Sequence, residues 1–183
     1  MKERDAVTWN ILLNAHGRSG AGTNVLSLLK EMKRTRPKWS DVTWLIVLSA
    51  CRQLKLLDEG LEIFQSMLKE EDVEGKERHF NSLIHLLSLD GRLDDAEQLA
   101  NEMPKADQVT WMTLLGSCRM KKDDRRAERI FGKLAQSTNE KSYTAAGMAL
   151  LSNTLSAAGR HEEALEVIRK MKEQGVRKMP GQT

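Results

Sequence analysis

The chain has 183 residues, of which 30% are charged and 40% hydrophobic, and its formal net charge at pH 7 is +3. This length suits one domain or a short array of repeats, and apolar runs of about five residues are too short to cross a membrane. The opening residues Met-Lys-Glu-Arg-Asp lack the apolar core of a signal peptide, so none is expected. The mild positive charge permits an anionic partner without requiring one.

Three closely similar segments recur along the chain: AVTWNILLNAH from Ala6, DVTWLIVLSAC from Asp41 and QVTWMTLLGSC from Gln108. Two more divergent copies place an aromatic or large apolar residue at the position of the tryptophan. The aligned residues are Trp9, Trp44, Phe80, Trp111 and Met148, and the first three intervals are 35, 36 and 31 residues. A period in this range is typical of helical repeat proteins.

Each copy reads as two helices joined by a turn. Apolar residues follow the aromatic residue three and four positions later, which predicts a first amphipathic helix. A polar or glycine-containing break follows, as in GRSGAG, RQLKLLDEG, LDGRLDD, RMKKDD and AAGRHEE. A second stretch with helical spacing then closes the copy; in the last copy its apolar residues are Leu165, Ile168 and Met171.

No stretch alternates apolar and polar residues as a strand would. One helical hairpin cannot bury its apolar face alone, whereas a stack of hairpins can. The sequence therefore predicts an all-α fold, a right-handed α-solenoid of about five helix-turn-helix repeats.

The tryptophans and cysteines are predicted to lie in the core. Trp9, Trp44 and Trp111 recur at the start of each first helix, where packing is the favoured role and stacking on RNA bases is the alternative. Cys51 and Cys118 each follow such a tryptophan by seven residues. Two lone cysteines cannot form a disulfide framework or a cysteine-based zinc site, so we interpret them as small core residues.

The period alone does not separate a tetratricopeptide array from a pentatricopeptide array. The order of unit lengths, the opening VTWN, the segment DVTWLIVLSACRQLKLLDEGLEIFQSM and the pattern DGRLDDAEQL…MP resemble the P-, L- and S-type units of plant pentatricopeptide repeat (PPR) proteins. The segments TWMTLLGSCR and LLSNTLSAAGRHEEALEVIRKMKEQGVRKMPG resemble the two E motifs of that family.

This resemblance divides the chain into six segments. They are the tail of a preceding S-type unit, P-, L- and S-type units, and the first and second E motifs: 1–5, 6–40, 41–76, 77–107, 108–139 and 140–183. Two features depart from the family pattern. The interval from Trp111 to Met148 is longer by about three residues, around residues 137–147, and His161 stands where the family usually has tryptophan.

The resemblance implies single-stranded RNA binding, with one base read per unit by two side chains. These are the residue after the aromatic position and the last residue of the unit, which gives the pairs Asn10 with Ser40, Leu45 with Lys76, and Asn81 with Asp107. In this family Asn-Asp selects uracil and Asn-Ser selects cytosine, so a cytosine two nucleotides upstream of the uracil is expected.

Other positions refine this reading. Leu45 cannot form a hydrogen bond through its side chain, so the L-type unit should discriminate poorly, or not at all, between RNA bases. Val7 and Val42 would flank the bases, and Met112, at the reading position of the first E motif, indicates that readout ends before the E motifs. Without the repeat register, Asn10 and Asn81 would read as ordinary residues of a helix start.

Catalysis by this chain is not predicted. His161-Glu162-Glu163 matches the H-x-E part of the zinc deaminase signature, but the chain has no C-x-x-C. His16, His79 and His85 are scattered and form no metal-ligand set. Neither a phosphate loop nor a nucleophile elbow is present, so no cofactor is expected.

The resemblance therefore implies the specificity segment of an organellar C-to-U RNA editing factor, in a mitochondrion or chloroplast. The implied partners are single-stranded RNA, a DYW-type deaminase domain in cis or in trans, and accessory editing factors at the E motifs, with no membrane. Three PPR units are few for a unique site, so a longer array is expected. The alternatives are a tetratricopeptide-like protein-binding adapter and a PPR protein of RNA stability or splicing; the E motifs disfavour the latter.

Overall fold

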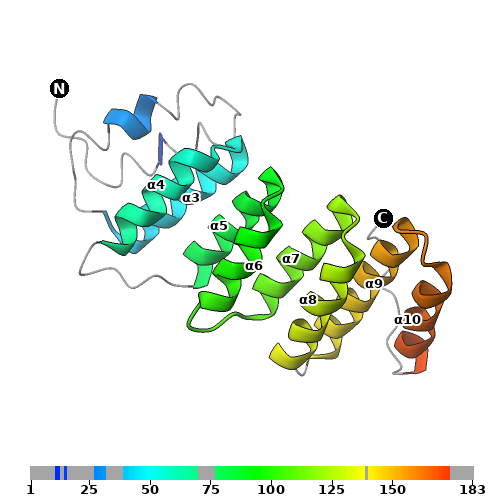
Figure 1. Ribbon diagram of the computed structural model, residues 1–183. Coiled ribbons are helices and arrows are strands. Elements are labelled where there is room, and N and C mark those ends of the chain that lie inside the picture. Colours follow the sequence, from blue (N-terminus) through cyan, green and yellow to red (C-terminus); the bar gives the residue numbers. More distant parts are fainter. Residues whose placement is uncertain are drawn as a thin grey trace. The chain divides into compact units, whose positions relative to one another are not determined.

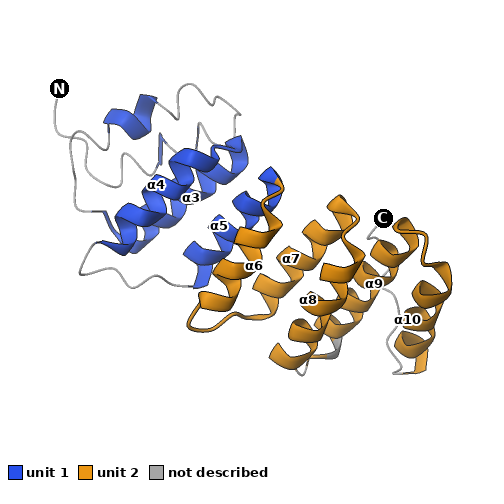
Figure 2. Cartoon of the chain, in the orientation of Figure 1, with its two compact units in different colours: residues 1–90 blue, residues 91–183 orange. Residues whose placement is uncertain are grey.

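The computed structural model describes residues 11–12, 15, 27–31, 39–69, 77–138 and 140–173. All regular secondary structure in these residues is helical (Figure 1). None of the helices described is both long and apolar enough to cross a membrane. The chain forms two compact units, which we call unit 1 (residues 1–90) and unit 2 (residues 91–183) (Figure 2).

Unit 1 contains three fully described helices. They are α3 (Asp41–Leu54), α4 (Leu57–Leu68) and α5 (Glu77–Asp90), and α3 packs against both α4 and α5. Residues 11–12, 15 and 27–31 are also helical. The helix pair α3–α4 follows the predicted division of a copy into a first and a second helix.

The described residues of unit 2 form five helices with the same alternation. They are α6 (Leu93–Glu102), α7 (Gln108–Lys121), α8 (Asp124–Ser137), α9 (Lys141–Ala157) and α10 (His161–Glu173). We call α3, α5, α7 and α9 the first helices, and α4, α6, α8 and α10 the second helices. Within unit 2, α7 packs against α6, α8 and α9, and α9 packs against α8 and α10. Within unit 2 the first helices α7 and α9 thus lie side by side, and the second helices α6, α8 and α10 pack against them.

The recurring tryptophan is a packing residue, as predicted. The exposed fractions of Trp44 and Trp111 are only 5% and 7%, and Met148 at the corresponding place in α9 is 7% exposed. The ring of Trp39 lies against Trp44 with 4.3 Å between ring centroids. Trp9 lies outside the described residues. Cys51 and Cys118 are fully buried free cysteines, which confirms their assignment to the core.

The extra residues between Trp111 and Met148 lengthen a helix. Helix α9 has 17 residues, against 14 in each of α3, α5 and α7. Met148, which corresponds to Trp111 in the repeat, is the eighth residue of α9, whereas Trp111 is the fourth residue of α7. Gly147 lets this helix approach α8, because an added Cβ atom would lie 2.5 Å from the Leu134 side chain.

The apolar pattern of the last helix predicts a buried Leu165, and this prediction is wrong. Leu165 shares helical spacing with Ile168 and Met171, but it is 62% exposed, whereas Met171 and Ala164 are buried. Helix α10 is the last described helix of unit 2 and contacts only α9 among the described elements. A helix packed on one side buries a narrower stripe than its apolar pattern indicates.

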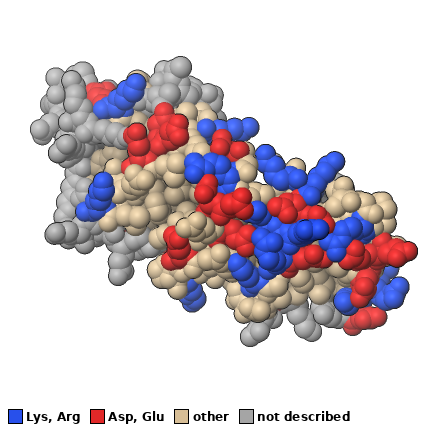
Figure 3. All heavy atoms as spheres, in the orientation of Figure 1, with Lys and Arg blue, Asp and Glu red and all other residues tan. Residues whose placement is uncertain are grey.

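Ion pairs connect the second helices of unit 2. Arg126 of α8 contacts Glu97 and Asp94 of α6, and Lys133 of α8 contacts Glu97 and Asn101. Arg160, directly before α10, binds Asp124 and Glu128 of α8 at 2.7 and 2.9 Å. Figure 3 shows the resulting alternation of basic and acidic side chains over this face. Because Arg126 and Glu97 are only 12% and 14% exposed, these pairs are shielded better than ordinary surface pairs.

We expect replacement of Trp111 by alanine to destabilise unit 2 strongly. Removing a buried tryptophan side chain from a packed core costs about 3–5 kcal/mol. Met120 on the same helix is 65% exposed, so Met120→Ala is the matched control and should change the unfolding free energy by less than about 0.5 kcal/mol. Denaturant unfolding followed by circular dichroism measures both. Equal effects of the two substitutions would contradict the core assignment of Trp111.

We further expect Cys118 to resist alkylation in the folded chain. Burial, as the largest cause, raises the pKa of the Cys118 thiol to about 12, and the thiolate is the reactive form. At about pH 8, iodoacetamide should therefore label Cys118 on the order of a thousandfold more slowly in the native chain than in guanidinium chloride. Peptide mass spectrometry reads the labelling at this cysteine. Comparable rates in both states would show that Cys118 is accessible.

Candidate nucleic-acid interface

The first helices share an exposed face opposite their buried aromatic residues. In α3 this face carries Val42, Leu45, Ser49 and Arg52, spaced by three or four residues, whereas Trp44 belongs to the buried side. Val42 is 56% exposed and Leu45, Ser49 and Arg52 are half-buried. In α7 the corresponding residues are Val109, Met112, Gly116 and Arg119. On each of these helices we call this side the first-helix face, and we describe it separately in the two units.

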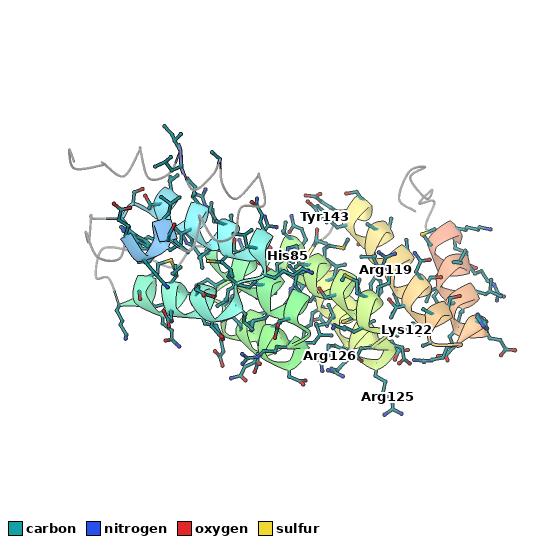
Figure 4. All side chains as sticks on the ribbon, turned by 90° about the horizontal axis from the view of Figure 1, so that it is seen from above. His85, Arg119, Lys122, Arg125, Arg126 and Tyr143 are labelled. Atoms are coloured by element: carbon teal, nitrogen blue, oxygen red, sulfur yellow. The ribbon has the colours of Figure 1, made fainter. Side chains whose placement is uncertain are left out.

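On α5 the first-helix face carries Arg78, Asn81 and His85. The Arg52 Nη1 atom of α3 lies 3.3 Å from His85 Nδ1, so the guanidinium donates to the imidazole (Figure 4 labels His85). Burial, and secondly the positive charge of Arg52, lower the pKa of His85. His85 is therefore neutral at pH 7 and protonated on Nε2. This contact joins the first-helix faces of α3 and α5 within unit 1.

The predicted second reading residues are the N-caps of the next first helix. The Ser40 hydroxyl accepts a hydrogen bond from the Thr43 amide at 3.2 Å. The Asp107 Oδ1 atom accepts from both the amide and the hydroxyl of Thr110, each at 2.9 Å. The sequence analysis did not predict this role, although Ser and Asp three residues before an amphipathic helix interior are typical caps.

These caps explain the recurring Val-Thr-Trp. The threonines Thr43 and Thr110 are fully buried and hold the cap, the following aromatic side chain packs in the core, and the preceding valine stays exposed. In α5, His79 stands in the place of threonine. It is also fully buried, and its Nε2 atom lies 3.1 Å from the carbonyl oxygen of Asp41 in α3.

The structure places part of the predicted site. Val42 and Ser40 lie at the start of α3, and Asn81 lies half-buried in α5, all in unit 1. Asp107 precedes α7 in unit 2. Val7, Asn10 and Lys76 lie outside the described residues. The pairing of Asn81 with Asp107 therefore stays a prediction.

The H-x-E sequence at His161 forms the start of helix α10, and its glutamate Glu163 is bound by Arg160. Glu162 and Glu163 lie in the first turn of α10, where acidic residues interact favourably with the helix dipole. Arg160 donates hydrogen bonds to Glu163, which lowers the pKa of that carboxyl. A carboxylate held by arginine is a poor proton donor at neutral pH. In the part of the chain that is described, no cluster of three or more His, Cys, Asp or Glu residues could hold a metal ion.

Family models of pentatricopeptide repeats match most of the chain. The model described as the PPR repeat family matches residues 4–53, and the PPR repeat model matches residues 42–71, 78–107 and 151–176. Two relatives from Arabidopsis thaliana are a mitochondrial and a chloroplastic pentatricopeptide repeat-containing protein. They are 35% identical over 182 residues and 36% identical over 181 residues. The matches cover 99% and 98% of this chain but 28% and 20% of the relatives, so the chain spans about a quarter of their length.

Solved structures share the fold. The maize pentatricopeptide repeat protein PPR10 in complex with an 18-nt psaJ RNA element superposes with a TM-score of 0.74 at 16% identity, over 94% of this chain and 26% of that one. The PPR domain of Arabidopsis thaliana protein-only RNase P 1, in complex with tRNA, gives 0.70 at 16% identity, over 92% and 89%. The fold is thus an α-solenoid of helical repeats. The recurring capped helix starts, the paired helices that they produce and these matches together show that the chain belongs to the pentatricopeptide repeat family.

Proposed function

We propose that this chain binds single-stranded RNA in a sequence-dependent manner along the first-helix face. The supporting observation is the constant register of that face: an exposed residue, then a buried residue, a packed aromatic, and a half-buried residue recur at the starts of α3 and α5. A polynucleotide has one repeating step per nucleotide, so such a surface can engage one nucleotide per unit. Two proteins of the same fold, PPR10 and the RNase P domain, are in complex with RNA.

Base recognition in this proposal belongs to Asn81 with Asp107 and to Asn10 with Ser40. The Asn amide offers a donor and an acceptor, which match the alternating groups on the edge of uracil or cytosine. Asp107 has a second oxygen for recognition, because both of its capping bonds go to Oδ1. Ser40 has a single oxygen that already caps α3, so we expect its unit to discriminate less.

The flanking positions fit this proposal. Val42 is exposed directly before the buried start of α3 and offers an apolar surface to the face of a base. Leu45 of the L-type unit presents no hydrogen-bonding group, so this unit contributes packing without selecting a base.

We place this binding activity in an organellar C-to-U editing factor. The P-L-S order followed by two E motifs supports this role, and relatives are described as mitochondrial or chloroplastic. The E motifs, in α7–α8 and α9–α10, would hold a DYW-type deaminase or an accessory factor. Catalysis would then come from a domain with the zinc signature that residues 1–183 lack.

The first test is a competition among four RNAs that differ only at the nucleotide assigned to Asn81 and Asp107. We expect the uracil RNA to win by about 1–3 kcal/mol, the usual value of a good base-edge pair. By the family code, Asn81→Thr should move the preference toward guanine, and Asp107→Ser should move it toward cytosine while retaining a capping hydroxyl. Equal binding of all four RNAs by the parent chain would rule out the assigned register. Binding of an apolar or acidic peptide without any RNA binding would support the adapter alternative.

A second test concerns the E motifs. Leu165 is the large exposed apolar residue of α10, so Leu165→Glu should weaken binding of a deaminase or accessory factor by at least about tenfold if α10 is buried in that complex. The exposed Lys172→Gln on the same helix is the control. RNA affinity should be unchanged in both variants. Full partner binding by Leu165→Glu, measured by pull-down and calorimetry with the full-length factor, would contradict a contact through α10.

A further inference from the structure

The turn between α7 and α8 carries four cations that the base-reading register does not use. Arg119 and Lys121 lie at the end of α7, Lys122 is the turn residue, and Arg125 lies in the first turn of α8. All four residues are exposed. Within the described residues of unit 2, their side chains make no ion pair, whereas Arg126, Arg129 and Arg160 are all bound by carboxylates.

The acidic residues next to this turn are already engaged. Asp123 caps α8 and binds Arg126 at 3.0 Å. Asp124 is bound by Arg160 at 2.7 Å, which lowers the pKa of its carboxyl. The positive charge of Arg119, Lys121, Lys122 and Arg125 is therefore not compensated locally.

The turn residue Lys122 occupies a backbone position that favours glycine. Lys122 has φ +56, in the left-handed region that side chains disfavour. At the same place after α9, unit 2 uses Gly159 with φ +83, and Gly91 before α6 has φ +91. Glycine would suit this turn better than lysine. Lys55 has the same conformation, with φ +55, at the end of α3, so the α7–α8 turn tolerates lysine and would also accept glycine.

The cluster is continuous with the first-helix face of α7. Arg119 lies on the same side of α7 as Val109 and Met112, since these residues are ten and seven positions apart along the helix. Gly116 between them faces open space, because a Cβ atom there would meet nothing within 4 Å. In Figure 4, Arg119, Lys122 and Arg125 follow one another from α7 to α8, and Arg125 points away from the ribbon. The Lys121 ammonium lies against Gly91, 2.8 Å from where a Cβ atom would stand.

We propose that Arg119, Lys121, Lys122 and Arg125, which we call the basic turn, bind phosphates of the RNA strand without reading its bases. This inference rests on the proposed RNA binding and extends it to a segment where base readout is not expected. Phosphate contacts fix the position of a strand and carry no sequence information. The basic turn would thus hold the strand beyond the last base-reading pair, and the E-motif hairpin α7–α8 would contact RNA as well as protein.

Lys122→Gly tests the proposal without harming the fold. It removes one cation and relieves the left-handed conformation, so thermal stability should be unchanged or higher. RNA affinity at low salt should fall by about three- to tenfold, and the slope of log K against log salt should shrink by about 0.7, the value for one phosphate contact with a single strand. Adding Arg119→Gln and Arg125→Gln should bring the loss of slope to about 2.

The matched control is Lys170→Gln, which changes the net charge equally at a lysine paired with Glu166. Its salt slope should equal that of the parent chain. Base preference at the nucleotide of Asn81 should persist in every variant, because only phosphate contacts are removed.

The outcomes separate the two proposals. A parent chain that binds no single-stranded RNA would overturn both. The parent chain could prefer uracil while the Lys122→Gly variant and the triple variant keep the parent's RNA affinity and salt slope. That result would overturn the proposal that the basic turn binds phosphates, but not the proposed base recognition. Weaker retention of the triple variant on heparin with unchanged RNA binding would also overturn it, and would point to an acidic protein surface instead.

Discussion

The interaction on which the rest of the structure depends is the side-chain cap at the starts of α3 and α7. Ser40 or Asp107 accepts a hydrogen bond from the amide of the threonine three residues later, and that threonine is completely buried. The cap fixes the point at which the helix begins. Because a helix has 3.6 residues per turn, fixing the start also fixes which side chains enter the core and which remain on the first-helix face.

The same cap links folding to the proposed recognition. Ser40 and Asp107, which we propose as base-reading residues at the ends of their units, are also the residues that cap the next helix. If Asp107 reads a base as proposed, its substitution acts on stability and on specificity together; the loss of a capping side chain alone costs about 1 kcal/mol. Aspartate serves both roles because it has two oxygens, whereas the serine hydroxyl at position 40 has one. The helix cap limits the amino acids allowed at this position, and in the proposed recognition the base limits them further.

Charge is used differently in the two layers of unit 2. On the second helices, arginines and carboxylates of consecutive hairpins bind one another, with Arg126 joining α8 to α6 and Arg160 joining α10 to α8. These pairs neutralise charges on the second helices and connect α8 both to α6 and to the start of α10. Among the described residues of unit 2, no carboxylate pairs with the cations of the α7–α8 turn. The net charge of +3 does not reveal this difference between paired and unpaired cations, because both kinds contribute equally to the net charge.

The sequence by itself determined the repeat, its helical character, the burial of Trp44 and Trp111 and the burial of both cysteines. These follow from periodicity, which is a local property: the spacing of apolar residues on a helix is the same in the chain and in the fold. The longer interval after Trp111 was also visible, but only the structure showed that it extends α9 by lengthening its N-terminal end.

Tertiary structure decided what depends on neighbours distant in sequence. Leu165 follows the apolar pattern of α10 but lies exposed, since helix α10 has a described neighbour only in α9. Burial, and secondly the charge of Arg52, which is 33 residues away in the chain, lower the pKa of His85. Glu163 is committed to Arg160, and the cations of the α7–α8 turn are left unpaired because nearby carboxylates bind other arginines. No local pattern encodes such choices, because they are settled by which side chains the packed hairpins bring within a few ångströms of one another.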